Sequence, residues 1–164
     1  MSNKTVARGF LVMTTVLSIS CTTHKGDTAM DTNLIFGKGE KAPSQVFTNT
    51  VWVNMLHTDE EKVFDTQVYD VIFEPAARTF WHSHPGGQIL LATSGTGYYQ
   101  EKGKPARKLA KGDVVAISPD VVHWHGAAPN TEFVHIGMST KVHEGPAVWA
   151  GPVTDEQYNE ATAE

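Results

Sequence analysis

The sequence contains little cysteine and little positive charge. Cys21 is the only cysteine among 164 residues, so the chain cannot form an internal disulfide. Its 13 lysines and arginines are outnumbered by 18 aspartates and glutamates, and the formal net charge is −5. Nucleic-acid surfaces need concentrated Lys and Arg to neutralise phosphates, and the sequence has no such cluster. It therefore predicts no nucleic-acid partner.

Long apolar runs are also absent, apart from one near the N-terminus. Lys4 and Arg8 precede an apolar stretch over residues 9–20, which is too short to span a bilayer as a helix and has signal-peptide length. Because Cys21 directly follows the small residue Ser20, residues 1–20 are predicted to be a lipoprotein-type signal peptide and Cys21 to carry a lipid anchor. The alternative is an ordinary secretory signal with Cys21 incidental. Either interpretation predicts export, and the first predicts a lipoprotein facing the periplasm or cell exterior, with no other membrane contact.

The segment after the signal peptide lacks any sustained periodicity. Residues 21–44 are polar and contain several glycines and a proline, which is typical of a flexible tether. The remaining residues, 45–164, have the length and composition of one globular domain. The predicted organisation is therefore signal peptide, tether and single domain.

Helical periodicity is scarce in the predicted domain. Between residues 46 and 139, short β-type runs alternate with turns rich in Gly, Pro, Asn and Asp, which predicts an all-β barrel of two sheets. The predicted strands cover residues 46–56, 67–73, 79–84, 88–93, 97–101, 106–109, 114–117, 123–125 and 132–139. Thr154 and Gln157 have the spacing of a capping box, so a short terminal helix is predicted over residues 154–161.

Histidines are concentrated in the middle of the chain. Five of the eight lie between positions 82 and 135, beginning with His82-Ser83-His84. Alternate residues on a strand point to the same face, so His82 and His84 are expected to converge, and His123 is expected to join them. Converging imidazoles suit borderline divalent ions, which predicts a metal site. The alternative is that each histidine is separately a core or surface residue.

Three further polar residues are candidates for the same site. Gln88 is a possible fourth ligand through its amide oxygen, or else a polar residue lining the barrel. Four neutral ligands would leave the metal its full double charge, which favours Lewis-acid chemistry. His125 and His135 are candidates for a general base, or for residues that orient a ligand by hydrogen bonding.

These motifs resemble the cupin superfamily over about residues 46–139. The first cupin motif is matched by His82, His84, Gln88 and Gly95, and the second by Gly112, Pro119 and His123. Gln88 stands in place of the usual glutamate, Ala76-Ala77 in place of the opening glycine, and Asp120 in place of the second-motif glycine. The resemblance implies a double-stranded β-helix, or jelly-roll barrel.

A closer resemblance is to the small single-domain bacterial cupins that include manganese-dependent hydroxynitrile lyases. It is carried by residues 81–85, by His123-Trp124-His125 and the four residues after it, and by residues 154–158. In those enzymes the exchange of glutamine for glutamate is normal. The resemblance implies manganese, with iron, nickel or zinc as alternatives. It implies His82, His84, Gln88 and His123 as ligands, and His125 and His135 as residues lining the active site.

Three functions follow as hypotheses. The first is a metal-dependent lyase acting on a small hydroxyl or carbonyl compound, in which a histidine such as His125 accepts a proton. The second is an iron-dependent dioxygenase, and the third is a lipoprotein that binds a metal or small molecule without catalysis. The apolar set Val134, Ile136 and Met138 alternates away from His135, which predicts a homodimer or larger even assembly, or else packing between the two sheets.

Overall fold

The computed structural model describes residues 34–163. The predicted signal peptide, Cys21 and most of the predicted tether lie outside these residues. No helix within the described range is long and apolar enough to cross a membrane.

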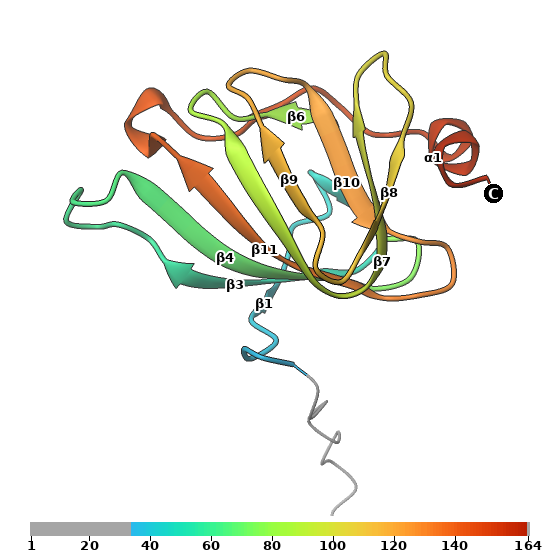
Figure 1. The fold of residues 1–164 in the computed structure, drawn as a ribbon, viewed down its shortest axis with the longest axis horizontal. Coiled ribbons are helices and arrows are strands. Elements are labelled where there is room, and N and C mark those ends of the chain that lie inside the picture. Colours follow the sequence, from blue (N-terminus) through green and yellow to red (C-terminus); the bar gives the residue numbers. More distant parts are fainter. Residues whose placement is uncertain (1–33, 164) are drawn as a thin grey trace, which may run out of the picture. The chain divides into compact units, whose positions relative to one another are not determined.

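Strands of the described domain curl into a barrel built from two antiparallel sheets, with one helix at the C-terminal end (Figure 1). The elements are β1 (Glu40–Lys41), β2 (Phe47–Thr48), β3 (Val51–His57), β4 (Thr66–Phe73), β5 (Arg78–Thr79), β6 (His82–Ser83), β7 (Gln88–Glu101), β8 (Arg107–Ala110), β9 (Val114–Ile117), β10 (His123–Ala127), β11 (Phe133–Thr140), the 3-10 helix η1 (Val142–Glu144), β12 (Val148–Trp149) and α1 (Asp155–Thr162). The strand order is β1-β3-β4-β11-β7-β10-β5-β2, with β6, β8, β9 and β12 paired to its side. The predicted all-β fold with a short terminal helix is confirmed.

The long strand β7 belongs to both sheets. Its first half pairs with β11 and β9, and its second half pairs with β10 and β8. The sequence predicted two strands separated by a turn at Ser94-Gly95, which is wrong. The chain instead continues as a strand, with an irregularity in its pairing to β11 and Gly95 at a φ of 72°. A bulge of this kind bends and twists a strand without ending it, which lets β7 pass between the sheets.

Two predicted strands are broken in the structure. Residues 46–56 form β2 and β3, separated by Asn49 in the left-handed region at a φ of 63°. Residues 79–84 likewise divide into β5 and β6, because β5 pairs with β2 while β6 pairs with β12. Both nevertheless pair with β10, which brings their residues beside His123 and its neighbours.

The sheet also extends into part of the predicted tether. Glu40 and Lys41 form β1 against β3, and the Ala42 amide donates to the Val51 carbonyl at 2.8 Å. Both β1 side chains are exposed, so this pairing depends on backbone hydrogen bonds and leaves no hydrophobic pattern in the sequence. Residues 40 and 41 are therefore part of the sheet, and Ala42 is hydrogen-bonded to it.

The apolar interior has two parts. The first fills the barrel and contains Phe73, Leu90 and Phe133 among its fully buried side chains. The second lies under α1 and contains Trp81 and Trp124, which alternate with the site histidines and face away from them. Tyr158 of α1 completes this second cluster.

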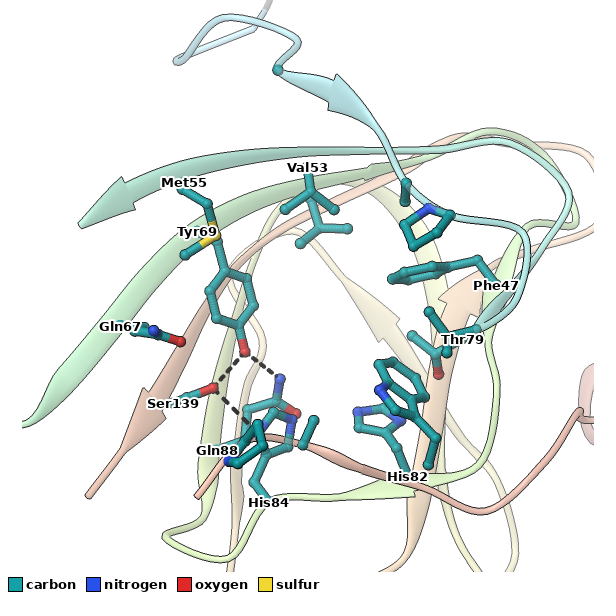
Figure 2. Close-up of a pocket in the computed structure, with 18 of the residues that line it drawn as sticks. Phe47, Val53, Met55, Gln67, Tyr69, Thr79, His82, His84, Gln88 and Ser139 are labelled. Atoms are coloured by element: carbon teal, nitrogen blue, oxygen red, sulfur yellow. Dashed lines mark hydrogen bonds between the residues drawn. The ribbon is translucent and has the colours of Figure 1, made fainter. Parts of the chain in front are cut away.

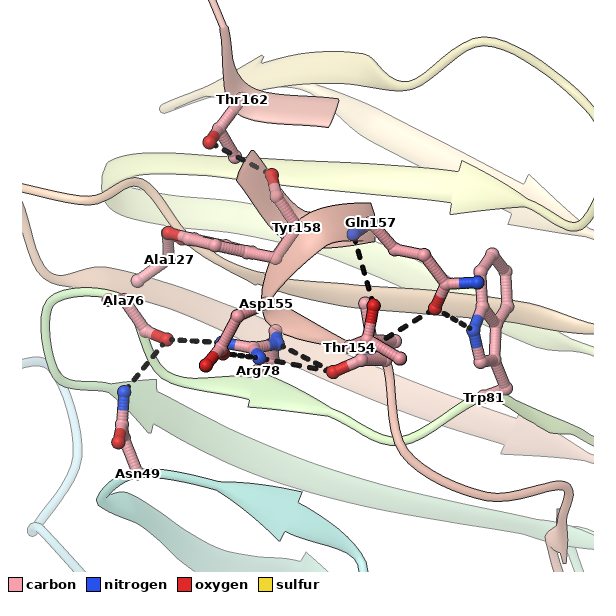
Figure 3. Close-up of polar contacts among 11 residues, drawn as sticks. Asn49, Ala76, Arg78, Trp81, Ala127, Thr154, Asp155, Gln157, Tyr158 and Thr162 are labelled. Atoms are coloured by element: carbon pink, nitrogen blue, oxygen red, sulfur yellow. Dashed lines mark hydrogen bonds and ion pairs between the residues drawn. The ribbon is translucent and has the colours of Figure 1, made fainter. Parts of the chain in front are cut away.

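Polar contacts attach α1 to the barrel (Figure 3). The Tyr158 hydroxyl donates to the Ala127 carbonyl at 2.8 Å, and the buried Arg78 guanidinium donates to Asp155 at 2.6 Å. The capping box between Thr154 and Gln157 is present as predicted. These contacts secure the end of β10, the strand that carries His123 and His125.

Candidate metal centre and cavity

His82 and His123 lie opposite each other on the paired strands β6 and β10, with ring centroids 4.2 Å apart. The Nδ1 of His82 contacts the Phe80 carbonyl at 2.9 Å, and the Nδ1 of His123 contacts the Val121 carbonyl at 2.8 Å. A carbonyl can only accept, so each Nδ1 carries the hydrogen and each Nε2 keeps a lone pair in the neutral ring. This is the arrangement in which proteins present histidines to a metal.

The Gln88 side chain places its amide oxygen, an acceptor, beside the Nε2 lone pair of His123. Its nitrogen donates to the Tyr69 hydroxyl at 2.7 Å, and its oxygen lies 3.0 Å from His123 Nε2. Burial lowers the pKa of His123 to about 4, so no ring proton bridges the two acceptors at neutral pH. Two acceptors facing each other in a dry interior repel, and a cation bound by both would make the contact favourable. The donor set therefore fits a metal ion.

His84 is oriented as the other candidate ligands are. Its Nδ1 is 3.2 Å from the Ser139 hydroxyl, and its Nε2 is buried without a partner among the described residues. Its ring centroid lies 5.2 Å from that of His82 and 6.0 Å from that of His123. All four predicted ligands thus meet at one end of the barrel.

The most compact group of ring nitrogens differs from the predicted ligand set. Nitrogens of His82, His123 and His125 lie within 4.8 Å of one another, and all three rings are buried. Neither nitrogen of His125 has a hydrogen-bond partner in the described structure, whereas Ser139 anchors His84. Because ligating histidines usually have the second nitrogen hydrogen-bonded, this difference favours His84 as the ligand and leaves His125 with an unused lone pair.

All five interior histidines are held neutral. Burial is the main cause in each case, with like-charged neighbouring rings adding to it for most of them. The pKa falls well below its usual value for His82 and His125, and to about 4 for His84, His123 and His135. Neutral imidazoles at pH 7 can bind a metal or accept a proton.

A cavity of about 1010 Å³ opens beside these residues (Figure 2). His82, His84 and Gln88 form one end, and apolar side chains such as Phe47 and Val53 form the opposite wall. The cavity therefore joins a metal-binding end to a space for a hydrocarbon group.

His125 and His135 differ in their access to the cavity. His125 lines the cavity, as the resemblance implied. His135 is fully buried and is not among the lining residues; its ring lies edge-on behind His125 at 4.8 Å and stacks on Phe73 at 5.7 Å. His135 therefore does not face the cavity, but its ring contacts that of His125, which does.

Three residues of the site were not predicted from the sequence. Tyr69 and Ser139 contact the candidate ligands. Two-residue spacing could have indicated them, because it places Tyr69 on the side of its strand with Phe73, and Ser139 on the side with His135. Trp149 of β12 contacts both the His82 ring at 4.9 Å and the Phe47 ring at 5.9 Å. No pattern marks Trp149, because β12 has only two residues and both are exposed.

Comparison with known proteins identifies relatives of this chain. The family model described as a cupin domain matches residues 69–137. The (R)-mandelonitrile lyase of Granulicella tundricola is 43% identical over 119 residues, covering 72% of this chain and 89% of that protein.

Solved structures agree with this relationship. The crystal structure of a cupin-like protein from Thermotoga maritima is 67% identical, with a TM-score of 0.78 over 79% of this chain and 97% of that one. A predicted oxalate decarboxylase from the same organism is 19% identical with a TM-score of 0.55, over 60% of this chain and 88% of that one, and so shares the fold alone. On its barrel, its motifs and these relatives, the chain belongs to the cupin family.

Proposed function

We propose that this cupin is a metal-dependent lyase that breaks the carbon–carbon bond of a cyanohydrin, giving a carbonyl compound and hydrogen cyanide. The observation that carries the proposal is the pair of acceptors on His123 and Gln88, 3.0 Å apart, with Gln88 at the histidine end of a mostly apolar cavity. The 43% identity to a mandelonitrile lyase supports this reaction class. That lyase's name specifies an aromatic cyanohydrin.

His82, His84, Gln88 and His123 are the residues proposed to hold the metal, with manganese as the proposed ion. When bound, the metal supplies Lewis acidity that makes a hydroxyl group easier to deprotonate. The four side chains are neutral, so they leave the ion's charge undiminished.

His125 is the proposed base. Its ring lines the cavity, both of its nitrogens lack partners among the described residues, and burial keeps it neutral. It accepts the hydroxyl proton as the carbonyl double bond forms and the bond to the nitrile carbon breaks. The electron pair leaves with cyanide, which then takes the proton from His125 and departs as hydrogen cyanide.

The apolar wall has a separate role in this scheme. Phe47, Val53 and Met55 offer contact to the hydrocarbon part of a substrate and have no side-chain hydrogen-bond donors to hold ordered water, so a bound substrate would displace the water there. Excluding water strengthens the electrostatic interactions at the polar end. His135, which does not reach the cavity, holds the His125 ring in place by packing against it.

The proposal is tested by measuring metal and turnover together. Protein purified without chelators or metal-affinity resin is assayed for bound elements and for release of benzaldehyde from mandelonitrile. Near-stoichiometric manganese with turnover is the expected result. His123→Ala should lose both. His125→Ala should keep the metal and lose about 10²–10⁴-fold in turnover, the usual contribution of a positioned base.

The exposed His143 provides the matched control, and His143→Ala should leave metal content and turnover unchanged. Bound metal without any cyanohydrin cleavage would contradict the lyase proposal. In that case a role in binding a metal or small molecule without catalysis would be favoured.

An iron-dependent dioxygenase is the second candidate, because three histidine rings fit one ion closely. If His82, His123 and His125 are the ligands, then His125 cannot serve as a base. Bound iron that is lost in His125→Ala and retained in His84→Ala would favour this candidate.

We also propose that the chain is exported and anchored through a lipid on Cys21. The support is the charged and apolar pattern of residues 1–20 that ends at this cysteine. Mass spectrometry of the membrane fraction should find a lipid-modified N-terminal Cys21. A Cys21→Ala variant that remains in the membrane fraction would contradict the anchor.

A further inference from the structure

Two hydroxyl groups join two of the proposed metal ligands in a continuous chain of hydrogen bonds (Figure 2). The Gln88 amide nitrogen is 2.7 Å from the Tyr69 hydroxyl, which is 2.9 Å from the Ser139 hydroxyl. Ser139 in turn lies 3.2 Å from Nδ1 of His84. Tyr69 comes from β4 and Ser139 from β11, so the chain spans three neighbouring strands, β4, β11 and β7.

The directions of the outer two hydrogen bonds follow from the chemistry of the partners. An amide nitrogen can only donate, so the Tyr69 oxygen accepts from Gln88. A His84 ring that offers Nε2 to a metal carries its hydrogen on Nδ1, so the Ser139 oxygen accepts from His84. Both oxygens are therefore occupied as acceptors by the ligand side chains.

One hydroxyl hydrogen is left over in this arrangement. Tyr69 and Ser139 own one hydroxyl hydrogen each, and the contact between them uses only one. Neither hydroxyl has another hydrogen-bond partner within residues 34–163, and both residues line the cavity. The unused hydrogen is therefore available to an acceptor atom in the cavity.

We infer that the Tyr69–Ser139 pair positions the Gln88 oxygen and the His84 Nε2 for the metal, and donates its remaining hydrogen to an acceptor atom of the bound substrate. The inference rests on the proposed function. It assigns the substrate a second polar atom besides the hydroxyl, which in a cyanohydrin is the nitrile nitrogen. Tyr69 and Ser139 are positioning residues for the metal and a binding group for the substrate.

The positioning role is tested by metal affinity, independently of activity. Manganese binding is measured by competition with a chelator for wild-type protein, Tyr69→Phe and Ser139→Ala. Each variant should bind about 10–100-fold more weakly, the usual effect of removing a group that orients a ligand. Unchanged affinity in both variants would overturn the positioning role.

Matched controls remove a hydroxyl elsewhere. Tyr158→Phe deletes a tyrosine hydroxyl bonded to Ala127 under α1, and Thr93→Ala deletes one bonded to the Val134 carbonyl. Neither residue lines the cavity, so both variants should keep wild-type metal affinity. A comparable loss in the controls would show a general stability effect and would also overturn the positioning role.

The donor role is tested at saturating manganese by titrating phenylacetonitrile, which lacks the hydroxyl and whose only polar group is the nitrile. Tyr69→Phe should weaken phenylacetonitrile binding by about 5–10-fold, the usual loss for one hydrogen bond. Unchanged phenylacetonitrile affinity would overturn the donor role. A wild-type protein that binds manganese but cleaves no cyanohydrin would defeat the proposed function, while the metal-affinity comparison would still decide the positioning role.

Discussion

Neutral, buried imidazole is the residue type on which the site depends. Alternation predicted that His82 and His84 converge, and they do so although His84 lies just past the end of β6. His123 comes from a strand nearly 40 residues later and is placed opposite His82 by the pairing of β6 with β10. Alternation could not show that Tyr69 would contact Gln88, because that contact requires β4, β11 and β7 to lie side by side. The local sequence pattern therefore predicts which histidines converge. The pairing of distant strands determines which side chains hydrogen-bond to them.

The interior histidines should make the metal-free protein sensitive to acid. Burial lowers the pKa of His84, His123 and His135 to about 4, from about 6.5 in an unfolded chain. Between these values the unfolded chain binds more protons than the folded one. The free energy of unfolding should therefore rise with pH from about 4 to about 6.5 and then level off. Urea denaturation of metal-free protein across this range measures it.

A single substitution checks the cause of that acid sensitivity. His135 does not reach the cavity, so His135→Leu removes one titrating ring without opening the site. The slope of unfolding free energy against pH should become shallower in this variant. An identical slope would contradict the assignment of the effect to buried histidines.

Among the secondary-structure elements, β11 contains a glycine, Gly137, that leaves room for the Tyr69 ring of β4. A Cβ atom at Gly137 would collide with that ring, so only glycine leaves the required space. Gly137→Ala should displace Tyr69, cost about 1–3 kcal/mol of stability by overpacking, and weaken manganese binding. Combining it with Tyr69→Phe should add little further loss of metal affinity. Additive losses would show that Gly137 acts on the site by another route.

The helix α1 should contribute to stability without affecting the site. Thr154→Ala removes the side-chain cap that accepts from the Gln157 amide and should cost about 1 kcal/mol. Metal affinity should remain at the wild-type value, because the contacts between α1 and the barrel lie on the face of β10 opposite the histidines. Thermal melts and chelator competition on the same samples measure both quantities.

Elements that depend on hydrophobic patterning were predicted better than those that depend on backbone pairing. β4 and β9, which alternate or bury apolar side chains, lie at or within a residue of their predicted positions. β1 and β12 were missed because both residues of each are exposed. The error at Ser94-Gly95 has a different origin: this dipeptide is typical of turns, and the pairing of β7 with β11 keeps it within a strand.

For the molecule as a whole, the outer face of the sheet containing β4 and β11 is the proposed surface for a homodimer. Ile136 and Met138 are partly exposed there, on the side of β11 opposite Ser139. Asp70 lies directly beside Ile136 and Asn54 in the register, and its side chain is only 3% exposed. This carboxyl has no hydrogen-bond or ion-pair partner within residues 34–163, and neither strand neighbour is titratable.

The proposed dimer should weaken as the pH rises through about 6. Burial raises the pKa of Asp70 to about 6, so the carboxyl is neutral below this value and charged above it. A partner subunit packed over this face would remove the water that remains near the carboxylate and disfavour its charged form further, so association should be tighter at pH 5 than at pH 7.5. Asp70→Asn should remove the difference, as measured by sedimentation equilibrium. A protein that is monomeric at both pH values would contradict the proposed interface.

The passage of β7 from one sheet to the other also sets the order of assembly. The strand pairs with β8, β9, β10 and β11, so neither sheet can be completed before the other begins to form. Folds dominated by such distant pairings close slowly, and His84 meets Ser139 only once the barrel has closed. Binding of the proposed metal by all four ligands would then come late in folding. The N-terminal pattern predicts that the chain crosses a membrane unfolded. It would then bind the ion that is most available in the compartment where it folds. The metal content of the protein would therefore depend on that compartment as well as on the chemistry of the site.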